Sequence, residues 1–275
     1  MRKPNVCGGY IAPLVVSACQ LWLPVAGLAQ QQASPSFPPA TQLTPIINAA
    51  VSGGSTVSTL RFRYTVSNSP QSVQEIAVWG LRYDASLTPK VIASPRGWRS
   101  YVARAGGPMI RWAAIKDFPA GSSDTGFDIE VPSLPGIVQA LVMGVIAPPQ
   151  LPTFADGKAP ADIPGSSILD NSVKLSTVGP VPIPRSVDPV AFLKSIIALK
   201  ETAFSFGWID NGGIRTSLDA KLSTAAASIT RGDISTARNQ LGALLNEIDA
   251  QSGKHLTPEA VGLLKFNIQF LLSNM

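Results

Sequence analysis

Over much of the N-terminal half, apolar and polar residues alternate along the chain. From Leu60 to Val66 every second residue is apolar and its neighbours are polar. A period of two is typical of a strand with one buried face. Further strand candidates, separated by turns rich in Pro and Gly, follow at residues 73–83, 90–93, 99–104, 109–115, 126–131 and 137–146. Short strands at this spacing, with no helices between them, predict an antiparallel β-sandwich over residues 42–149.

The last part of the chain carries apolar residues at helical spacing. Asp188 before Pro189 predicts the start of a first helix, which ends at Gly207. Further helices are expected over residues 216–230 and 235–252, and a fourth begins after Thr257, where Pro258 takes the first helical position. Short connections favour antiparallel neighbours. We therefore expect an α+β, multidomain chain: an antiparallel β-sandwich followed by a four-helix C-terminal module at residues 188–275.

Two segments lack sustained periodicity. Nine prolines lie between residues 148 and 189, which predicts a Pro-rich linker over residues 150–187, with a short edge strand at 172–178. Residues 30–41 are rich in Gln, Ser and Pro and predict a flexible spacer.

The N-terminus has the pattern of an export signal. Arg2 and Lys3 precede an uncharged and mostly apolar stretch over residues 6–28, which ends in small residues and is followed by three glutamines. This pattern predicts a signal peptide over residues 1–29, cleaved after Ala29. The chain is therefore expected to act outside the cytoplasm, either secreted, at the cell surface or in a periplasm.

An alternative is a lipoprotein anchored at Cys19, because residues 16–19 (VSAC) resemble a lipobox. Against it, the apolar run continues over residues 21–26, where an anchored chain would have a polar spacer. A retained transmembrane helix is disfavoured, since Pro13 and Pro24 interrupt a stretch that needs about 20 apolar residues.

Cleavage would change the chemistry of the chain. Both cysteines, Cys7 and Cys19, would be removed, so neither disulfides nor thiol chemistry is expected. Loss of Arg2 and Lys3 would leave 20 basic and 17 acidic residues, a net charge of +3. The basic residues are scattered without a run that could follow phosphates, so nucleic-acid binding is not expected.

The C-terminal third resembles a known kind of module. The matching segments are residues 207–214 (GWIDNGGI), 217–222 (SLDAKL), 231–233 (RGD), 239–241 (NQL) and 253–257 (GKHLT). Together they resemble FIMAH-type helical modules of secreted and surface-attached bacterial proteins. More loosely, residues 64–68 (YTVSN), 95–98 (PRGW) and 126–128 (GFD) are similar to β-domains that accompany such proteins. The resemblance implies an accessory role without established catalysis and supplies no functional residues.

Charged residues and the single histidine offer little chemistry. Asp124, Asp128 and Glu130 lie close in sequence, and paired carboxylates could hydrolyse glycosides or bind calcium weakly, although a solvated sheet face is the commoner arrangement. His255 is the only histidine and is expected to close a turn between helices, because it has no clustered carboxylates or thiols. The tripeptide at residues 231–233 spells an integrin motif, but between two helices it predicts a turn and a cap.

Aromatic residues of the sandwich are the candidate ligand-binding residues. Trp79, Trp98, Trp112 and Tyr101 could stack on sugars if exposed, and Trp98 is expected to be the most exposed; the alternative is that tryptophans fill the core. The leading hypothesis is a non-enzymatic accessory protein that binds a partner protein or a cell-envelope component such as a polysaccharide. The alternatives are a carbohydrate-binding protein and a carboxylate-dependent glycosidase. No catalytic residue, cofactor or metal is expected.

Overall fold

A computed structural model describes residues 39–103, 107–146 and 168–275. The expected signal peptide, the Cys19 alternative, most of the spacer and the first part of the expected linker, residues 150–167, therefore lie outside the described residues. Among the described helices, none is long and apolar enough to cross a membrane.

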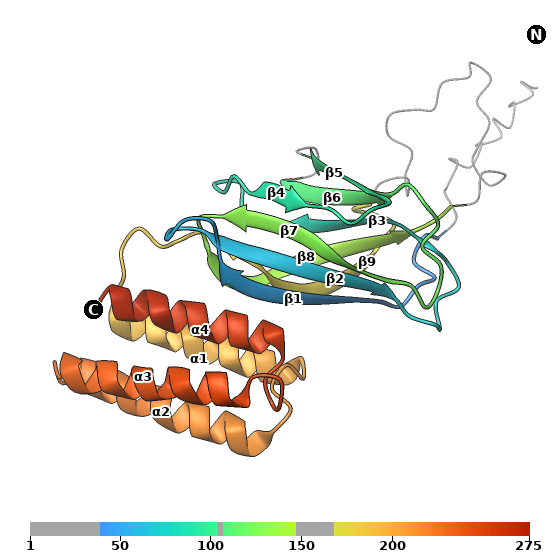
Figure 1. Cartoon of the computed structure of the whole chain (residues 1–275). Coiled ribbons are helices and arrows are strands. Elements are labelled where there is room, and N and C mark those ends of the chain that lie inside the picture. The colour runs from blue at the N-terminus through green and yellow to red at the C-terminus, as the bar shows by residue number, and fades with distance from the viewer. Residues whose placement is uncertain (1–38, 104–106, 147–167) are drawn as a thin grey trace, which may run out of the picture. The chain divides into compact units, whose positions relative to one another are not determined.

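Two antiparallel sheets form the N-terminal part (Figure 1). The four-stranded sheet has the order β1-β2-β7-β4, and the five-stranded sheet has the order β5-β6-β3-β8-β9. The strands are β1 (Pro45–Gly53), β2 (Leu60–Asn68), β3 (Ile76–Arg82), β4 (Lys90–Ala93), β5 (Trp98–Ala103), β6 (Met109–Ala114), β7 (Ser123–Val131), β8 (Leu134–Gly144) and β9 (Val173–Val181). With the helices that follow, they confirm the expected α+β class and the sandwich.

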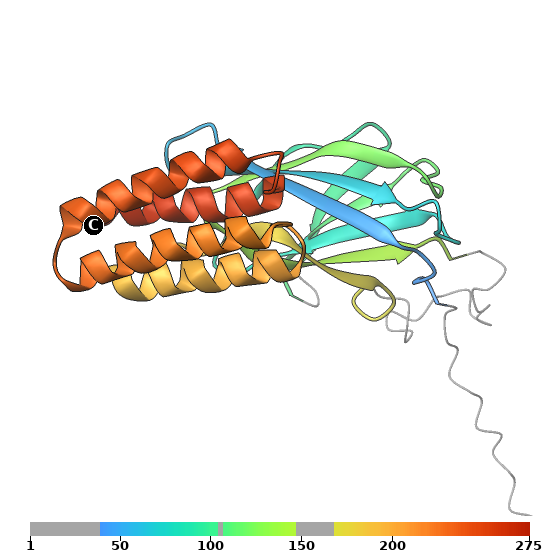
Figure 2. The ribbon, with the colours of Figure 1, turned by 90° about the horizontal axis from the view of Figure 1, so that it is seen from below.

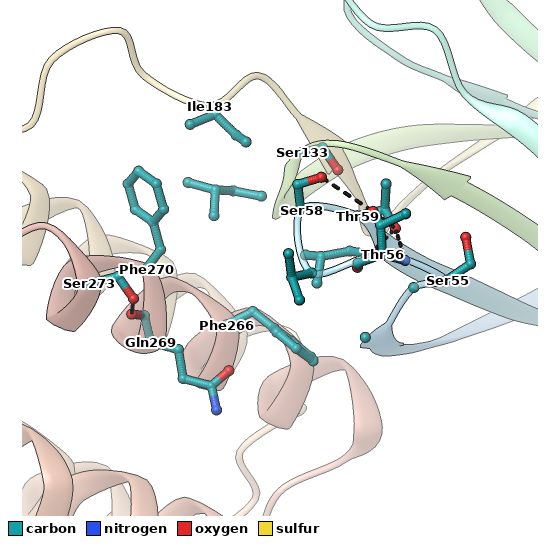
Figure 3. Close-up of a pocket in the computed structure, with 15 residues that line it drawn as sticks. Ser55, Thr56, Ser58, Thr59, Ser133, Ile183, Phe266, Gln269, Phe270 and Ser273 are labelled. Atoms are coloured by element: carbon teal, nitrogen blue, oxygen red, sulfur yellow. Dashed lines mark hydrogen bonds between the residues drawn. The ribbon is translucent and has the colours of Figure 1, made fainter.

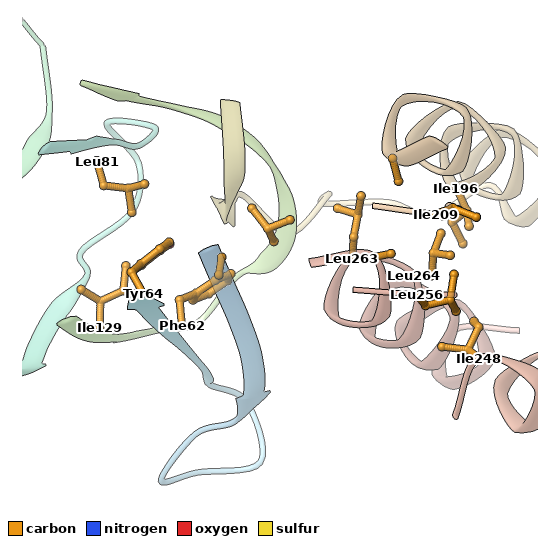
Figure 4. Close-up of a cluster of buried hydrophobic side chains, with 14 of the residues drawn as sticks. Phe62, Tyr64, Leu81, Ile129, Ile196, Ile209, Ile248, Leu256, Leu263 and Leu264 are labelled. Carbon is orange, nitrogen blue, oxygen red and sulfur yellow. The ribbon is translucent and has the colours of Figure 1, made fainter. Parts of the chain in front are cut away.

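Aromatic side chains fill the space between the sheets. Trp79 of β3 and Trp112 of β6 stack with ring centroids 4.4 Å apart, and Phe127 of β7 packs edge-on against both. Phe62 and Tyr64, from the alternating pattern of β2, are completely buried (Figure 4). The period of two therefore identified the inner face of this strand correctly.

Two strands differ from the expectation, and both lie at sheet edges. β1 was not predicted, because its sequence (PIINAAVSG) does not alternate clearly: Ile46 is 50% exposed, whereas Ala49 is buried. β9 pairs along its whole length with β8, so the five-stranded sheet continues into the segment expected to be a linker. The edge strand anticipated at residues 172–178 is thus present and extends to Val181.

Four helices follow: α1 (Pro189–Ser205), α2 (Gly212–Thr230), α3 (Ile234–Gln251) and α4 (Pro258–Ser273) (Figures 1 and 2). As expected, Asp188 caps α1 by accepting hydrogen bonds from the backbone N–H groups of Val190 and Ala191. α2 begins four residues before its predicted start, with two glycines that gave no helical signal. The Asn211 side chain caps this start by accepting hydrogen bonds from the backbone N–H groups of Gly213 and Ile214.

The segment at residues 231–233 has the expected structural role. Arg231 ends α2, Gly232 has a φ of 78°, and the Asp233 side chain accepts a hydrogen bond from the Thr236 N–H to cap α3. The left-handed conformation at Gly232 favours glycine, so the tripeptide serves to end one helix and begin the next.

Helix α4 packs against the sandwich as well as against the other helices. Glu259, 3% exposed, accepts a hydrogen bond of 2.7 Å from the backbone N–H of Ala49 in β1. The Asn267 side chain donates to the backbone oxygen of Pro135 in β8 at 2.9 Å. Because β1 is an edge strand, the Glu259 contact covers a backbone group that would otherwise be open to pairing with another chain.

Candidate functional site

A cavity lies between one end of the sandwich and α4. It encloses about 590 Å³. Figure 3 shows the loop between β1 and β2 on one side, Phe266 and Phe270 of α4 on the other, and Ile183, which follows β9, above them. Ser133 and Leu134, where β7 turns into β8, form a further part of the wall.

The residues that line the cavity are uncharged. Apolar surface comes from Val57, Leu60, Leu134, Ile183, Phe266 and Phe270, and hydrogen-bonding groups come from Ser55, Thr56, Ser58, Thr59, Ser133, Gln269 and Ser273. Volume and lining are typical of sites for small or extended ligands with an apolar body and a few polar groups.

Glu130 holds the β1–β2 loop in place from outside the cavity. Its Oε1 accepts hydrogen bonds from the backbone N–H of Ser55 at 3.0 Å and from the hydroxyl of Thr59 at 2.8 Å. Hydrogen bonds from Ser55 and Thr59 lower the pKa of Glu130, so its carboxylate stays ionised and the loop stays anchored at neutral pH. Gly54 allows the same loop to fold closely on itself, since a Cβ there would clash with the Thr59 hydroxyl.

Ser133 is a buried polar residue in the cavity wall. It is 3% exposed, and its hydroxyl has no hydrogen-bond partner among the described residues. A buried hydroxyl without a partner is energetically costly, and a ligand that supplied one would recover that cost.

The tryptophans do not form a ligand platform but fill the core, which was the alternative to sugar stacking. Trp79 and Trp112 have no exposed surface, and Trp98 is only 6% exposed, so the prediction that Trp98 is exposed is wrong. The turn before it, with a φ of 92° at Gly97, directs the ring into the core against Phe127. The indole N–H of Trp98 also donates to Asp124 at 2.8 Å. Of the four candidates, only Tyr101 is exposed, at 42%.

The three carboxylates considered for glycoside hydrolysis are each engaged by a different set of partners. Asp124 accepts from the Trp98 indole, Glu130 anchors the β1–β2 loop, and Asp128 is buried beneath Arg61 and Arg63. Asp128 and Glu130 belong to the outer face of β7, because Phe127 and Ile129 beside them are in the core. None of the three lines the cavity.

His255 lies where expected, between α3 and α4. Its Nδ1 is 2.8 Å from Asp210 Oδ1, and its backbone oxygen accepts from the Asp210 N–H at 3.2 Å, which ties together two loops of the helical module. Within the described ranges, no group of three or more His, Cys, Asp or Glu residues could hold a metal ion.

One signal in the sequence pointed to the cavity, and this signal was missed. Phe266 and Phe270 lie four residues apart on α4, beside its main apolar stripe, and Phe270 also contacts Phe192 of α1. Two apolar rows on one helix indicate two packing partners. The loop and strand ends that complete the cavity come from distant parts of the sequence and show no pattern of their own.

Comparisons with known proteins identify no family. No family model matches the chain, and no curated protein matches it. Among solved structures it is similar to an uncharacterised protein from Nocardia farcinica with an immunoglobulin-like fold, at 14% identity and a TM-score of 0.27, over 50% of this chain and 98% of that chain. At that score the likeness carries no argument, so the assignment of the fold depends on the two sheets and four helices themselves.

Proposed function

We propose that this protein is a non-enzymatic, extracytoplasmic accessory protein, and that the cavity beside α4 seats an uncharged, largely apolar segment of a partner protein. The observation that carries the proposal is the cavity itself: about 590 Å³, walled by Phe266 and Phe270, with no charged residue in its lining. The FIMAH-type resemblance of the C-terminal third supports an accessory role.

The chemistry of the cavity favours binding over catalysis. Catalytic sites combine titratable groups within a cleft, whereas no charged residue lines this cavity, and Glu130 is held by loop hydrogen bonds outside it. Phenylalanine rings contribute a large area for apolar contact, and the surrounding hydroxyls can pair with the backbone of an extended segment. A charged segment would lose hydration there without gaining a partner.

Ser58→Trp tests the proposal, because Ser58 is exposed on the loop and a large side chain there would fill the cavity mouth. The uncharged dye Nile red should bind wild type saturably and be displaced by apolar peptides selected from a displayed library. Ser58→Trp should abolish both, and Thr88→Trp, on an exposed loop elsewhere, should change neither. A peptide selection that does not depend on Ser58, or a hydrolytic activity abolished by Asp124→Asn, would contradict the proposal.

A neutral sugar is the second candidate, because aromatic rings beside hydroxyls and the Gln269 amide also suit carbohydrate. A glycan array separates the two candidates. Neutral glycans that bind wild type and Thr88→Trp but not Ser58→Trp would replace the peptide with a cell-envelope polysaccharide as ligand. Trp98 is no longer a candidate contact, because its ring is buried.

Export is part of the proposal. The signal-peptide pattern favours cleavage after Ala29, and the alternative is lipid attachment at Cys19. Mass spectrometry of the mature N-terminus distinguishes the two, since lipid attachment would add acyl mass to a chain beginning at residue 19. A chain that retained Met1 would contradict both.

A further inference from the structure

The two sheets of the sandwich differ in charge. No strand of the five-stranded sheet contains an acidic residue, whereas basic residues occur on four of its strands: Arg82, Arg99, Arg111 and Lys174. The four-stranded sheet has three basic and three acidic residues, Arg61, Arg63, Lys90, Asp124, Asp128 and Glu130. The positive charge of the sandwich strands is therefore concentrated on one sheet.

The strand register places much of this charge on one face. One row of paired residues crosses the sheet from β5 through β6, β3 and β8 to β9. It consists of Tyr101, Arg111, Gly80, Leu141 and Lys174, one from each strand in that order. Directly paired residues lie on the same face of a sheet. Since Trp112, the neighbour of Arg111, stacks in the core, this row belongs to the outer face.

Arg99 joins the row from β5, two residues before Tyr101, and so shares its face. It lies diagonally from Arg111, at the roughly 7–8 Å typical of such neighbours. Ile168 packs on Met109 and Leu141 and covers the middle of the face, so Arg99 and Arg111 lie to one side of it and Lys174 to the other.

Arg99, Arg111 and Lys174 form no ion pair within the described residues. The buried Nε of Arg111 has no hydrogen-bond partner there either. By contrast, Arg61 and Arg63 of the other sheet both pair with Asp128. On the same face as Arg99, Tyr101 of β5 is 42% exposed.

We propose that the outer face of the five-stranded sheet, through Arg99, Arg111, Lys174 and the exposed side chain of Tyr101, attaches the protein to an anionic lipid surface. Cations spread over several strands of a sheet match a plane of negative headgroups, and each adds favourable electrostatic energy. An aromatic side chain beside the cations suits the boundary between headgroups and acyl chains. A soluble polyanion would gain nothing from an aromatic side chain at this position.

The test is sedimentation of the full chain with vesicles of phosphatidylcholine alone, or with about one third phosphatidylglycerol. Wild type should bind only the anionic vesicles, and salt should weaken the binding. Arg99→Gln with Arg111→Gln should weaken the binding by about 25-fold, because each lost charge costs roughly fivefold. Lys194→Gln with Lys254→Gln, an equal charge change at exposed sites of the helical module, should have little effect.

A second double variant keeps the test sound if the half-buried Arg111 proves necessary for folding. Arg99→Gln with Lys174→Gln changes only exposed residues and should lose a similar amount of affinity while circular dichroism is unchanged. The proposal is overturned if wild type does not bind anionic vesicles, or if both double variants bind like the control. If the protein bound inorganic polyphosphate or duplex DNA as tightly as vesicles, and Tyr101→Ala did not change that binding, the face would be assigned to a soluble polyanion instead.

Discussion

At the scale of single residues, Asp128 shows how a polar group is stabilised within the sandwich. Its side chain is 1% exposed, and it accepts hydrogen bonds from Arg61 and from Arg63, whose Nη2 is 2.9 Å away. Burial opposes its ionisation, but the hydrogen bonds and charges of the two arginines prevail and hold its pKa below the ordinary 3.8. The ion pair thus covers β7 without leaving a buried charge unpaired.

Asp128→Asn should destabilise the fold by about 1–3 kcal/mol at neutral pH, because two arginines lose their shared partner. A pKa that is lower in the folded state gives stability that is complete above the unfolded pKa, about 3.9, and is lost as pH falls through the folded pKa. Urea unfolding should therefore show the variant and wild type converging below about pH 4. A difference between them that is independent of pH would contradict the role of this ion pair.

Trp98 shows the limit of sequence reasoning at this scale. It follows Pro95, Arg96 and Gly97, and such a turn gives no information about which side of the sheet the next residue faces. The structure decides this through Phe118 and Phe127, whose rings lie 5.1 Å from that of Trp98 and come from later segments. Candidate binding residues chosen by type alone were therefore mostly core residues, as Trp79 and Trp112 also show.

At the scale of elements, α4 serves both the helical module and the sandwich. Gly262 permits the close approach of α4 to β1, because a Cβ there would meet Val51 Cγ2 at 2.7 Å and Val51 Cβ at 2.9 Å. Gly242 of α3 is the matched contrast, since a Cβ there would meet nothing within 4 Å. The two glycines occupy similar helix interiors and differ in what lies opposite.

We expect Gly262→Ala and Gly242→Ala to have opposite effects. Alanine favours helix by about 1 kcal/mol over glycine, so Gly242→Ala should raise the free energy of unfolding by about that amount. At Gly262 the added methyl forces α4 and β1 apart, which should cost about 1–3 kcal/mol. Denaturant unfolding of both variants measures the difference, and stabilisation by both would show that α4 does not pack closely on β1.

Glu259 provides a second test of the same contact. Glu259→Ala would leave the buried N–H of Ala49 without an acceptor and should cost about 1–3 kcal/mol. Glu259→Gln keeps an amide oxygen in reach and should lose less. Hydrogen exchange at Ala49 should accelerate in the order wild type, Gln, Ala, and equal exchange in all three would contradict the hydrogen bond.

Elements with local signals were predicted, and elements defined by distant partners were not. Three helices begin at side-chain caps, Asp188, Asn211 and Asp233, that bond to residues two or three positions ahead. Because these signals are local, the boundaries of the helices could be predicted to within a few residues. β1 lies between β2 and α4, and its weak pattern acquires meaning only from these two neighbours. The cavity beside α4 depends on the same long-range packing, which explains why the sequence did not reveal it.

At the scale of the whole described chain, one connected set of buried side chains extends from the sandwich into the helical module. Its members include Tyr64 and Ile129 between the sheets and Leu263 and Ile248 among the helices (Figure 4). A sandwich and a helical module joined only by a linker would have separate cores. Here the Glu259, Gly262 and Asn267 contacts join the two through α4.

We therefore expect the sandwich and the helices to unfold together. The stacked Trp79 and Trp112 give near-ultraviolet circular dichroism a signal from the sandwich, while the far-ultraviolet signal is dominated by the helices. Both signals should lose their amplitude over one urea transition in wild type, which is the test of two-state behaviour. Gly262→Ala should separate them, because it weakens the contact between the parts and leaves each interior intact. Two transitions in wild type would show that the helical module folds on its own and that the cavity beside α4 opens without loss of either core.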